Sequence, residues 1–97
     1  MKAYELLVLL NPTLDEDARE ASVGRVQDVI TNDGGTIDNV DSWGKRKLAY
    51  EIDGLTDGDY VLFDFHTEPS AIAELDRVLH IADPVVRYMI VAREDRE

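Results

Sequence analysis

The pattern of hydrophobic and polar positions predicts four β-strands. Ala3–Asn11 is apolar almost throughout, which is typical of a central strand. Along Tyr60–His66, successive side chains are expected to point to opposite faces of a strand. Thr36–Ile52 is unusually long for one strand, so we expect a bend or bulge within it, at Gly44. A fourth strand is predicted at Val85–Arg93.

Two segments with helical periodicity separate these strands. In the first, Thr13 and Glu16 have the spacing of a capping box, which predicts a helix from there to about Ile30. The Gly-rich stretch 32–35 then stops it. The second helix is predicted to open at Pro69, where a proline suits the first turn. Its apolar stripe consists of Ile72, Leu75, Val78, Leu79 and Ala82.

The order strand, helix, strand, strand, helix, strand predicts an α+β fold of the ferredoxin-like β-α-β-β-α-β plan. Residues 53–59 are predicted as a turn that is too short for a helix, so the second and third strands pair antiparallel. Right-handed crossovers then place both helices on one face of a four-stranded antiparallel sheet. We expect one domain over residues 1–93 and a short charged C-terminal tail over 94–97.

The face of the sheet without helices must meet water or a partner. By strand alternation, the residues predicted to face the helices are Leu6, Val8, Leu48, Tyr50, Ile52, Val61, Phe63, Phe65, Tyr88 and Ile90. The residues predicted to face away from the helices are Glu5, Leu7, Leu9, Lys47, Ala49, Leu62, Asp64, His66, Arg87, Met89, Val91 and Arg93. The apolar members of the second set form a patch that is larger than a monomer usually exposes, which predicts a docking surface. The alternative is an ordinary face shielded by Lys and Arg stems.

Charge is distributed unevenly along the chain. The formal net charge is -11, which disfavours non-specific binding to nucleic acid. Yet Lys45, Arg46 and Lys47 follow one another directly, two residues after Trp43. Arg46 can contact a phosphate bidentately, and the two lysines act as point charges. The stretch is the best candidate for a binding site, although Trp43 alone would also suit a core.

Signals for chemistry are absent from the sequence. There is no Cys, which excludes disulfides, thiolate nucleophiles and Cys-based metal sites and suits a reducing cytoplasm. His66 and His80 lack metal-site spacing and favour structural or surface roles. No phosphate-binding glycine motif and no 18-residue apolar run occurs. We therefore expect no enzyme activity, cofactor, metal, membrane span or small-molecule substrate.

Several segments resemble one known family. They are "MKAYELLVLLNP", "DSWGKRKLAYEI", "GDYVLFDF", "ELDRVL" and "DPVVRYMIV". Their order and spacing, over essentially the whole chain, are similar to those of the family of the sixth protein of the bacterial small ribosomal subunit. The most specific matches are the early Tyr-Glu pair, the Trp-Gly-basic stretch and the Asp-x-x-Val-Arg that opens the last strand.

The resemblance implies a non-enzymatic, cytoplasmic ribosome component. It implies binding to the central domain of small-subunit ribosomal RNA as a heterodimer with small-subunit protein eighteen, a small basic protein. The family's RNA-side and partner-side contacts fall on Lys2, Tyr4, Trp43, Lys45, Arg46, Lys47, Arg87 and Arg93. Alternation also places Tyr4 in the core. Residue 2 is Lys where the family usually has Arg, and the short tail predicts no tail-mediated contact.

Two other classes of function compete with this interpretation. A protein-interaction or small-molecule regulatory module on the same fold would use the open sheet face, and it predicts a homodimer. A small ferredoxin-like enzyme, such as an acylphosphatase or a dimeric oxygenase, would need a Gly-rich phosphate loop with a following Arg or a catalytic His constellation. Neither occurs in the sequence.

Overall fold

The computed structural model describes residues 1–52 and 54–96, and its elements follow the predicted order. The strands are β1 (Lys2–Leu10), β2 (Thr36–Ile52), β3 (Leu55–Thr67) and β4 (Val85–Ala92). The helices are α1 (Glu16–Asn32) and α2 (Ile72–Ile81), with 3₁₀ turns η1 (Pro69–Ala71) and η2 (Glu94–Arg96). The strands form one antiparallel sheet in the order β2-β3-β1-β4. The ferredoxin-like prediction is confirmed.

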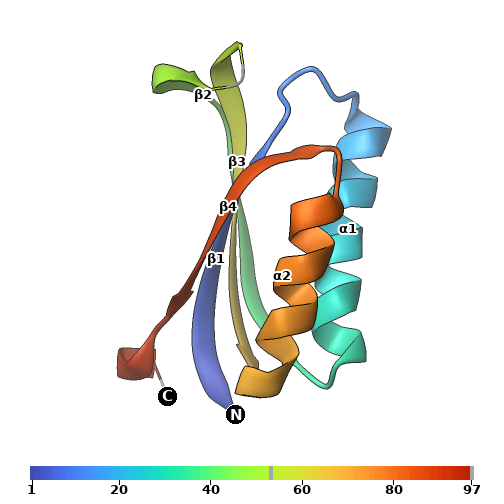
Figure 1. Ribbon diagram of the computed structural model, residues 1–97, viewed down its shortest axis with the longest axis vertical. Coiled ribbons are helices and arrows are strands. Elements are labelled where there is room, and N and C mark those ends of the chain that lie inside the picture. The colour runs from blue at the N-terminus through green and yellow to red at the C-terminus, as the bar shows by residue number, and fades with distance from the viewer. Residues whose placement is uncertain (53, 97) are drawn as a thin grey trace.

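Both helices cover one face of the sheet, and the other face is open (Figure 1). The core lies between these layers. Its largest fully buried side chains include Leu6, Phe63 and Phe65 from the two central strands. Val26 and Ile30 of α1, with Leu75, Val78 and Leu79 of α2, close it from the helix side. Burial of each such side chain stabilises the fold by roughly 1.5–3 kcal/mol.

The helix starts differ from those predicted. Asp15, not Thr13, caps α1, because its carboxylate accepts from the Ala18 backbone N–H at 2.8 Å. Thr13 instead donates to the Asn11 side chain from both its backbone nitrogen and its hydroxyl. The predicted capping box is therefore wrong. Pro69 opens η1, and α2 begins only at Ile72, so the second helix starts one turn later than expected.

The β2–β3 hairpin is much longer than predicted. We expected the third strand to begin at Tyr60, but β3 begins at Leu55, which pairs with Ile52. Most of the predicted turn is thus strand, and its first residue, Asp53, lies outside the described residues. The hairpin extends past the helices, and its end curls toward the open face (Figure 1). Gly44 marks the irregularity, with a φ of 78° beside a register shift, as expected.

That register shift reverses the sidedness of the outer part of β2. One extra residue moves every later side chain to the opposite face. Leu48 and Ile52, which we expected to face the helices, lie on the open-face side with Leu9. Tyr50, also expected inside, is 71% exposed, whereas Leu9, expected outside, is 4% exposed. The assignments of Leu48, Tyr50 and Ile52 to the helix side were therefore wrong. Leu9 lies on the predicted side of the sheet, but the hairpin covers it.

Candidate nucleic-acid interface

The basic stretch lies on the projecting part of β2. Lys45, Arg46 and Lys47 are all exposed. Lys45 pairs with Asp59 and Arg46 with Gly58, so the three side chains alternate between the two sides of the ribbon. Among the described residues, no carboxylate lies within ion-pair distance of these three side chains. Their charge is therefore available to an external ligand.

Trp43 lies at the bulge where the hairpin leaves the body of the protein. Its side chain is 40% exposed, and its ring centroid is 5.8 Å from that of Tyr60, with the planes tilted by 43°. The indole N–H donates to the Asp41 carboxylate at 3.2 Å. Trp43 thus presents part of an aromatic ring at the surface beside the three bases, and it is not a core residue.

A buried ion pair fixes the root of this hairpin to α1. The Arg19 guanidinium donates to both oxygens of Asp59, at 2.5 and 3.3 Å, and to the Ser42 hydroxyl at 3.0 Å. The Asp59 side chain is only 6% exposed. The hydrogen bond from Arg19 to Asp59 raises the pKa of the guanidinium above its ordinary value. The clamp holds both strands of the hairpin in a defined position relative to α1.

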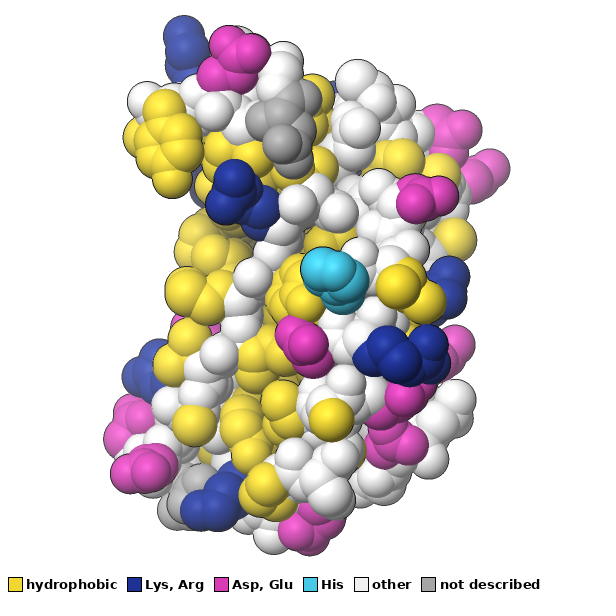
Figure 2. All heavy atoms as spheres, viewed as in Figure 1, with side chains coloured by type: hydrophobic (Ala, Val, Ile, Leu, Met, Phe, Trp, Pro, Cys, Tyr) yellow, Lys and Arg dark blue, Asp and Glu magenta, His cyan; other side chains and the backbone are white. Residues whose placement is uncertain are grey.

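The open face carries an apolar hollow at the foot of the hairpin. Its volume is about 190 Å³, and its lining comprises Leu7, Leu9, Ile52, Tyr60, Arg87, Tyr88 and Met89. Met89 is 57% exposed and Val91 37% exposed. Figure 2 shows hydrophobic side chains along the left edge of the molecule, where the outline is hollowed below the hairpin. Arg87 is exposed at this hollow, with no acid within ion-pair distance among the described residues.

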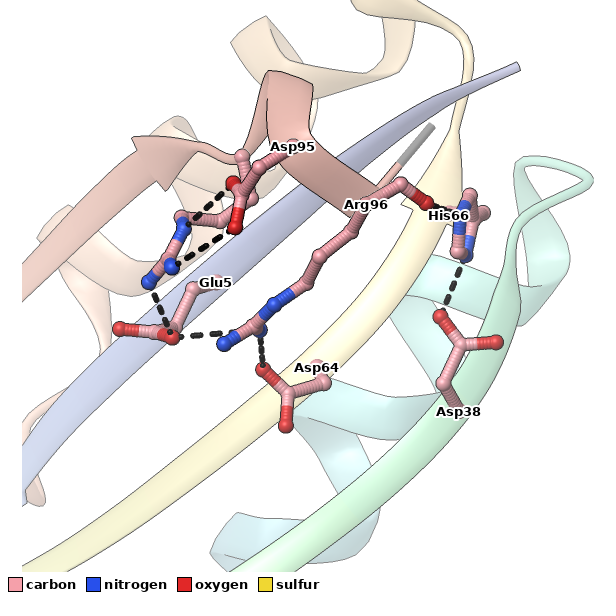
Figure 3. A network of polar contacts seen from close by, with 7 residues as sticks. Glu5, Asp38, Asp64, His66, Asp95 and Arg96 are labelled. Carbon is pink, nitrogen blue, oxygen red and sulfur yellow. Dashed lines mark hydrogen bonds and ion pairs between the residues drawn. The ribbon is translucent and has the colours of Figure 1, made fainter.

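A polar network occupies the opposite end of the open face (Figure 3). Arg93 donates to Glu5 at 3.1 Å and to both oxygens of Asp95 at 3.2 Å. Arg96 donates to Asp64 at 2.6 Å and lies 3.3 Å from Glu5. The hydrogen bond with Arg93 lowers the pKa of Asp95 below its ordinary value. Arg93 therefore forms part of an intramolecular network, unlike the basic side chains of the hairpin.

His66 belongs to the same network. Its Nδ1 contacts the Asp38 carboxylate on β2, and its Nε2 lies 3.3 Å from the Arg96 carbonyl oxygen (Figure 3). This structural role agrees with the prediction for His66, and His80 is exposed near the end of α2. Within residues 1–52 and 54–96, no group of three His, Asp or Glu side chains is placed to hold a metal ion. No helix there is long and apolar enough to cross a membrane.

The last two predicted site residues lie at the start of β1. Tyr4 is 9% exposed, and its ring stacks on Phe65 with centroids 5.7 Å apart. It offers a partner almost no surface, as alternation had indicated. Lys2 is exposed and pairs with Thr67 across the β1–β3 ladder.

The structure thus separates the predicted site residues into groups. Trp43 and the three adjacent bases lie together on the hairpin, Arg87 borders the hollow, and Lys2 and Arg93 lie at the other end of the sheet. Sequence reasoning missed Arg96, which we had placed in a tail without contacts. Cross-strand pairing of Glu5 with Asp64 is the signal that a cation is needed there, but it requires the β1–β3 register.

Comparison with known proteins identifies relatives over nearly the whole chain. The family model described as ribosomal protein S6 matches residues 3–92. Small ribosomal subunit protein bS6 of Clostridium botulinum strain Hall is 50% identical over 94 residues, covering 97% of this chain and 100% of that protein. The same protein of Clostridium acetobutylicum is 49% identical over 94 residues, covering 97% and 99% respectively.

Solved structures agree with this result. The crystal structure of 30S ribosomal protein S6 from Thermotoga maritima superposes with a TM-score of 0.94 at 31% identity, covering 98% of this chain and 90% of that one. The C-terminal domain of the MgtC protein from Mycobacterium tuberculosis has a TM-score of 0.56 at 16% identity, covering 100% and 93%. The second likeness shows a shared fold only.

Proposed function

The chain belongs to the ribosomal protein S6 family, and we propose that it binds the central domain of small-subunit ribosomal RNA together with small-subunit protein eighteen. Membership makes it a protein of the small ribosomal subunit that is not an enzyme and that works in the cytoplasm with the ribosome. The RNA, the partner and the contact residues are the proposed part. The observation that supports them best is the cluster of three basic side chains on the hairpin that make no ion pair with a described carboxylate.

We assign RNA contact to the hairpin. Lys45, Arg46 and Lys47 project beyond the acidic body, and none is neutralised by a described carboxylate. A guanidinium and two ammonium groups on both sides of one ribbon suit phosphates that approach from either side of it. Trp43, half exposed beside them, can stack on an unpaired base or a ribose.

We assign the partner protein to the open face. The hollow lined by Leu7, Leu9 and Met89 is apolar, which suits a protein side chain better than a phosphate. Glu5 and Asp64 lie on the same face and repel phosphate. A basic partner fits both features, and its charge would offset part of the net -11 that otherwise opposes RNA binding.

The experiment is a fluorescence-anisotropy titration of a labelled central-domain RNA fragment. The chain is added alone, then with an equimolar amount of protein eighteen, and protein eighteen is added alone as control. We expect weak binding by either protein alone and binding at least tenfold tighter by the pair. Equal affinity of the pair and of protein eighteen alone would remove this chain from the RNA interface.

The competing module on the same face makes a different prediction. A chain that pairs with itself through the hollow should form a dimer whose fraction rises with concentration. Analytical ultracentrifugation of the chain alone distinguishes this self-association from the proposed heterodimer, because we expect a monomer until protein eighteen is added.

A further inference from the structure

Glu5 and Asp64 are directly opposite one another in the β1–β3 register. Both side chains are about three-quarters buried, at 24% and 23% exposure. Like charges that face each other across a ladder destabilise a sheet, and partial burial increases the effect. This position therefore requires a cation. In the structure the Arg96 guanidinium supplies it, 2.6 Å from Asp64 and 3.3 Å from Glu5 (Figure 3).

The hold on Arg96 is slight. Arg93 is fixed by its backbone N–H to Ala3 at 2.8 Å and by its own bond to Glu5, and the β1–β4 ladder already ends at Ala92. Beyond Arg93, the contacts among described residues that position the Arg96 backbone are one hydrogen bond within the turn η2 and the His66 contact. Its side chain remains 39% exposed. Arg96 can therefore leave the two carboxylates without disturbing the sheet.

We propose that Glu5 and Asp64 form an arginine-binding position of the partner interface, which Arg96 fills in the free chain and which an arginine of the basic partner takes over on binding. This inference rests on the proposed function. The position is continuous with the apolar face, since the next outward pair along the ladder is Leu7 with Leu62. Arg96 itself demonstrates that a guanidinium fits between the carboxylates. Two carboxylates that are about three-quarters buried repel a phosphate, so the occupant is protein and not RNA.

The test compares R96A with R77A in titrations of protein eighteen by isothermal calorimetry. Each variant removes one positive charge, but Arg77 lies on α2, paired with Glu74 on the helix side of the sheet. If Arg96 competes, R96A should bind the partner about two- to fivefold more tightly than the parent chain, the range that an exposed ion pair contributes. R77A should stay within about 1.5-fold. Equal gains in both variants, or weaker binding by R96A, would overturn the proposal.

A second titration does not depend on the partner. The peptide acetyl-Arg-Arg-Arg-amide is added to ¹⁵N-labelled R96A and to the double variant R96A/D64N, and amide shifts are followed. We expect shifts centred on Glu5 and Asp64 in R96A and their loss in the double variant, with both proteins retaining the parent circular-dichroism spectrum. Shifts spread evenly over the acidic surface would overturn the arginine position. Failure of protein eighteen to bind any variant would contradict the heterodimer instead, and the peptide result then stands alone.

Discussion

Leu9 fills the space that a side chain at Gly58 would need. A Cβ placed on Gly58 would lie 2.0 Å from the Leu9 Cδ1 and 3.3 Å from the Leu48 Cδ2. Leu9 is 4% exposed, so it has little room to withdraw. The close approach of strand β3 to Leu9 is what allows the hairpin to lie over the open face, and only glycine permits it.

Gly58→Ala should therefore lower the free energy of unfolding by about 1–3 kcal/mol, the usual effect of overpacking. Urea denaturation measures it. Gly24→Ala in α1 is the matched control, because no other described part of the chain lies within 4 Å of a Cβ there and the substitution favours the helix by about 0.5–1 kcal/mol. In an L9A background, adding G58A should lower the free energy of unfolding by less than it does in the parent chain. Equal losses in both backgrounds would show that Leu9 is not the obstacle.

Arg19→Met should destabilise the protein by about 2–4 kcal/mol, because it leaves the Asp59 carboxylate buried without its partner. Arg25→Met on the same helix is the control, since Arg25 is exposed and makes no ion pair among the described residues. We expect less than about 0.5 kcal/mol from it. Adding D59N to R19M should recover part of the loss. A double variant as unstable as the sum of the single ones would contradict a specific pair.

Thr67→Val should raise the free energy of unfolding by about 1 kcal/mol. The Thr67 hydroxyl is buried and has no hydrogen-bond partner among the described residues, so replacing it with a methyl group removes a desolvation cost while keeping the shape. Thr56→Val, at an exposed position of the same strand, should change stability by less than about 0.5 kcal/mol. A stabilisation of the same size at Thr56 would attribute the gain to strand propensity.

Tyr88 should make stability fall at alkaline pH. Its hydroxyl donates to the Asp76 carboxylate at 2.7 Å, and this bond, burial and the negative charge raise the pKa of Tyr88 above 10.0. A folded-state pKa above the unfolded one gives stability that is complete below about pH 10 and is lost as the pH rises through the folded value. Tyr88→Phe should lack this component. Parallel stability curves for parent and variant between pH 9 and 11 would contradict the linkage.

The order of strands and helices could be predicted from the sequence because the spacing of apolar residues and the Pro and Gly residues that end elements indicate the same boundaries. Pro12 ends one strand, and the stripe of Leu75 and Leu79 locates the second helix without any tertiary information. The sidedness of the outer hairpin could not be predicted in this way. The bulge at Trp43 adds one residue to the count, and it inverts Leu48 and Ile52 although their own residue types are those of a core.

The candidate site was predictable to a similar extent. Consecutive bases beside Trp43 identify the hairpin, since nothing else in an acidic chain concentrates positive charge. The different environments of Arg87 and Arg93 were not predictable, because both are arginines at outward positions of one strand segment. Only the register places Glu5 near Arg93, and the turn η2 adds Asp95 to it, whereas Arg87 lies beside an apolar hollow.

We propose that the basic side chains of the β2–β3 hairpin contact RNA phosphates, and the salt dependence of RNA binding tests this most directly. The slope of log affinity against log salt is measured for complexes with protein eighteen that contain the parent chain, R46A/K47A or R25A/R77A. Both variants remove two positive charges, from the hairpin and from the helices respectively. We predict that the slope falls by about 0.7–0.9 per lost contact for R46A/K47A and is unchanged for R25A/R77A. An unchanged slope for R46A/K47A would contradict the account.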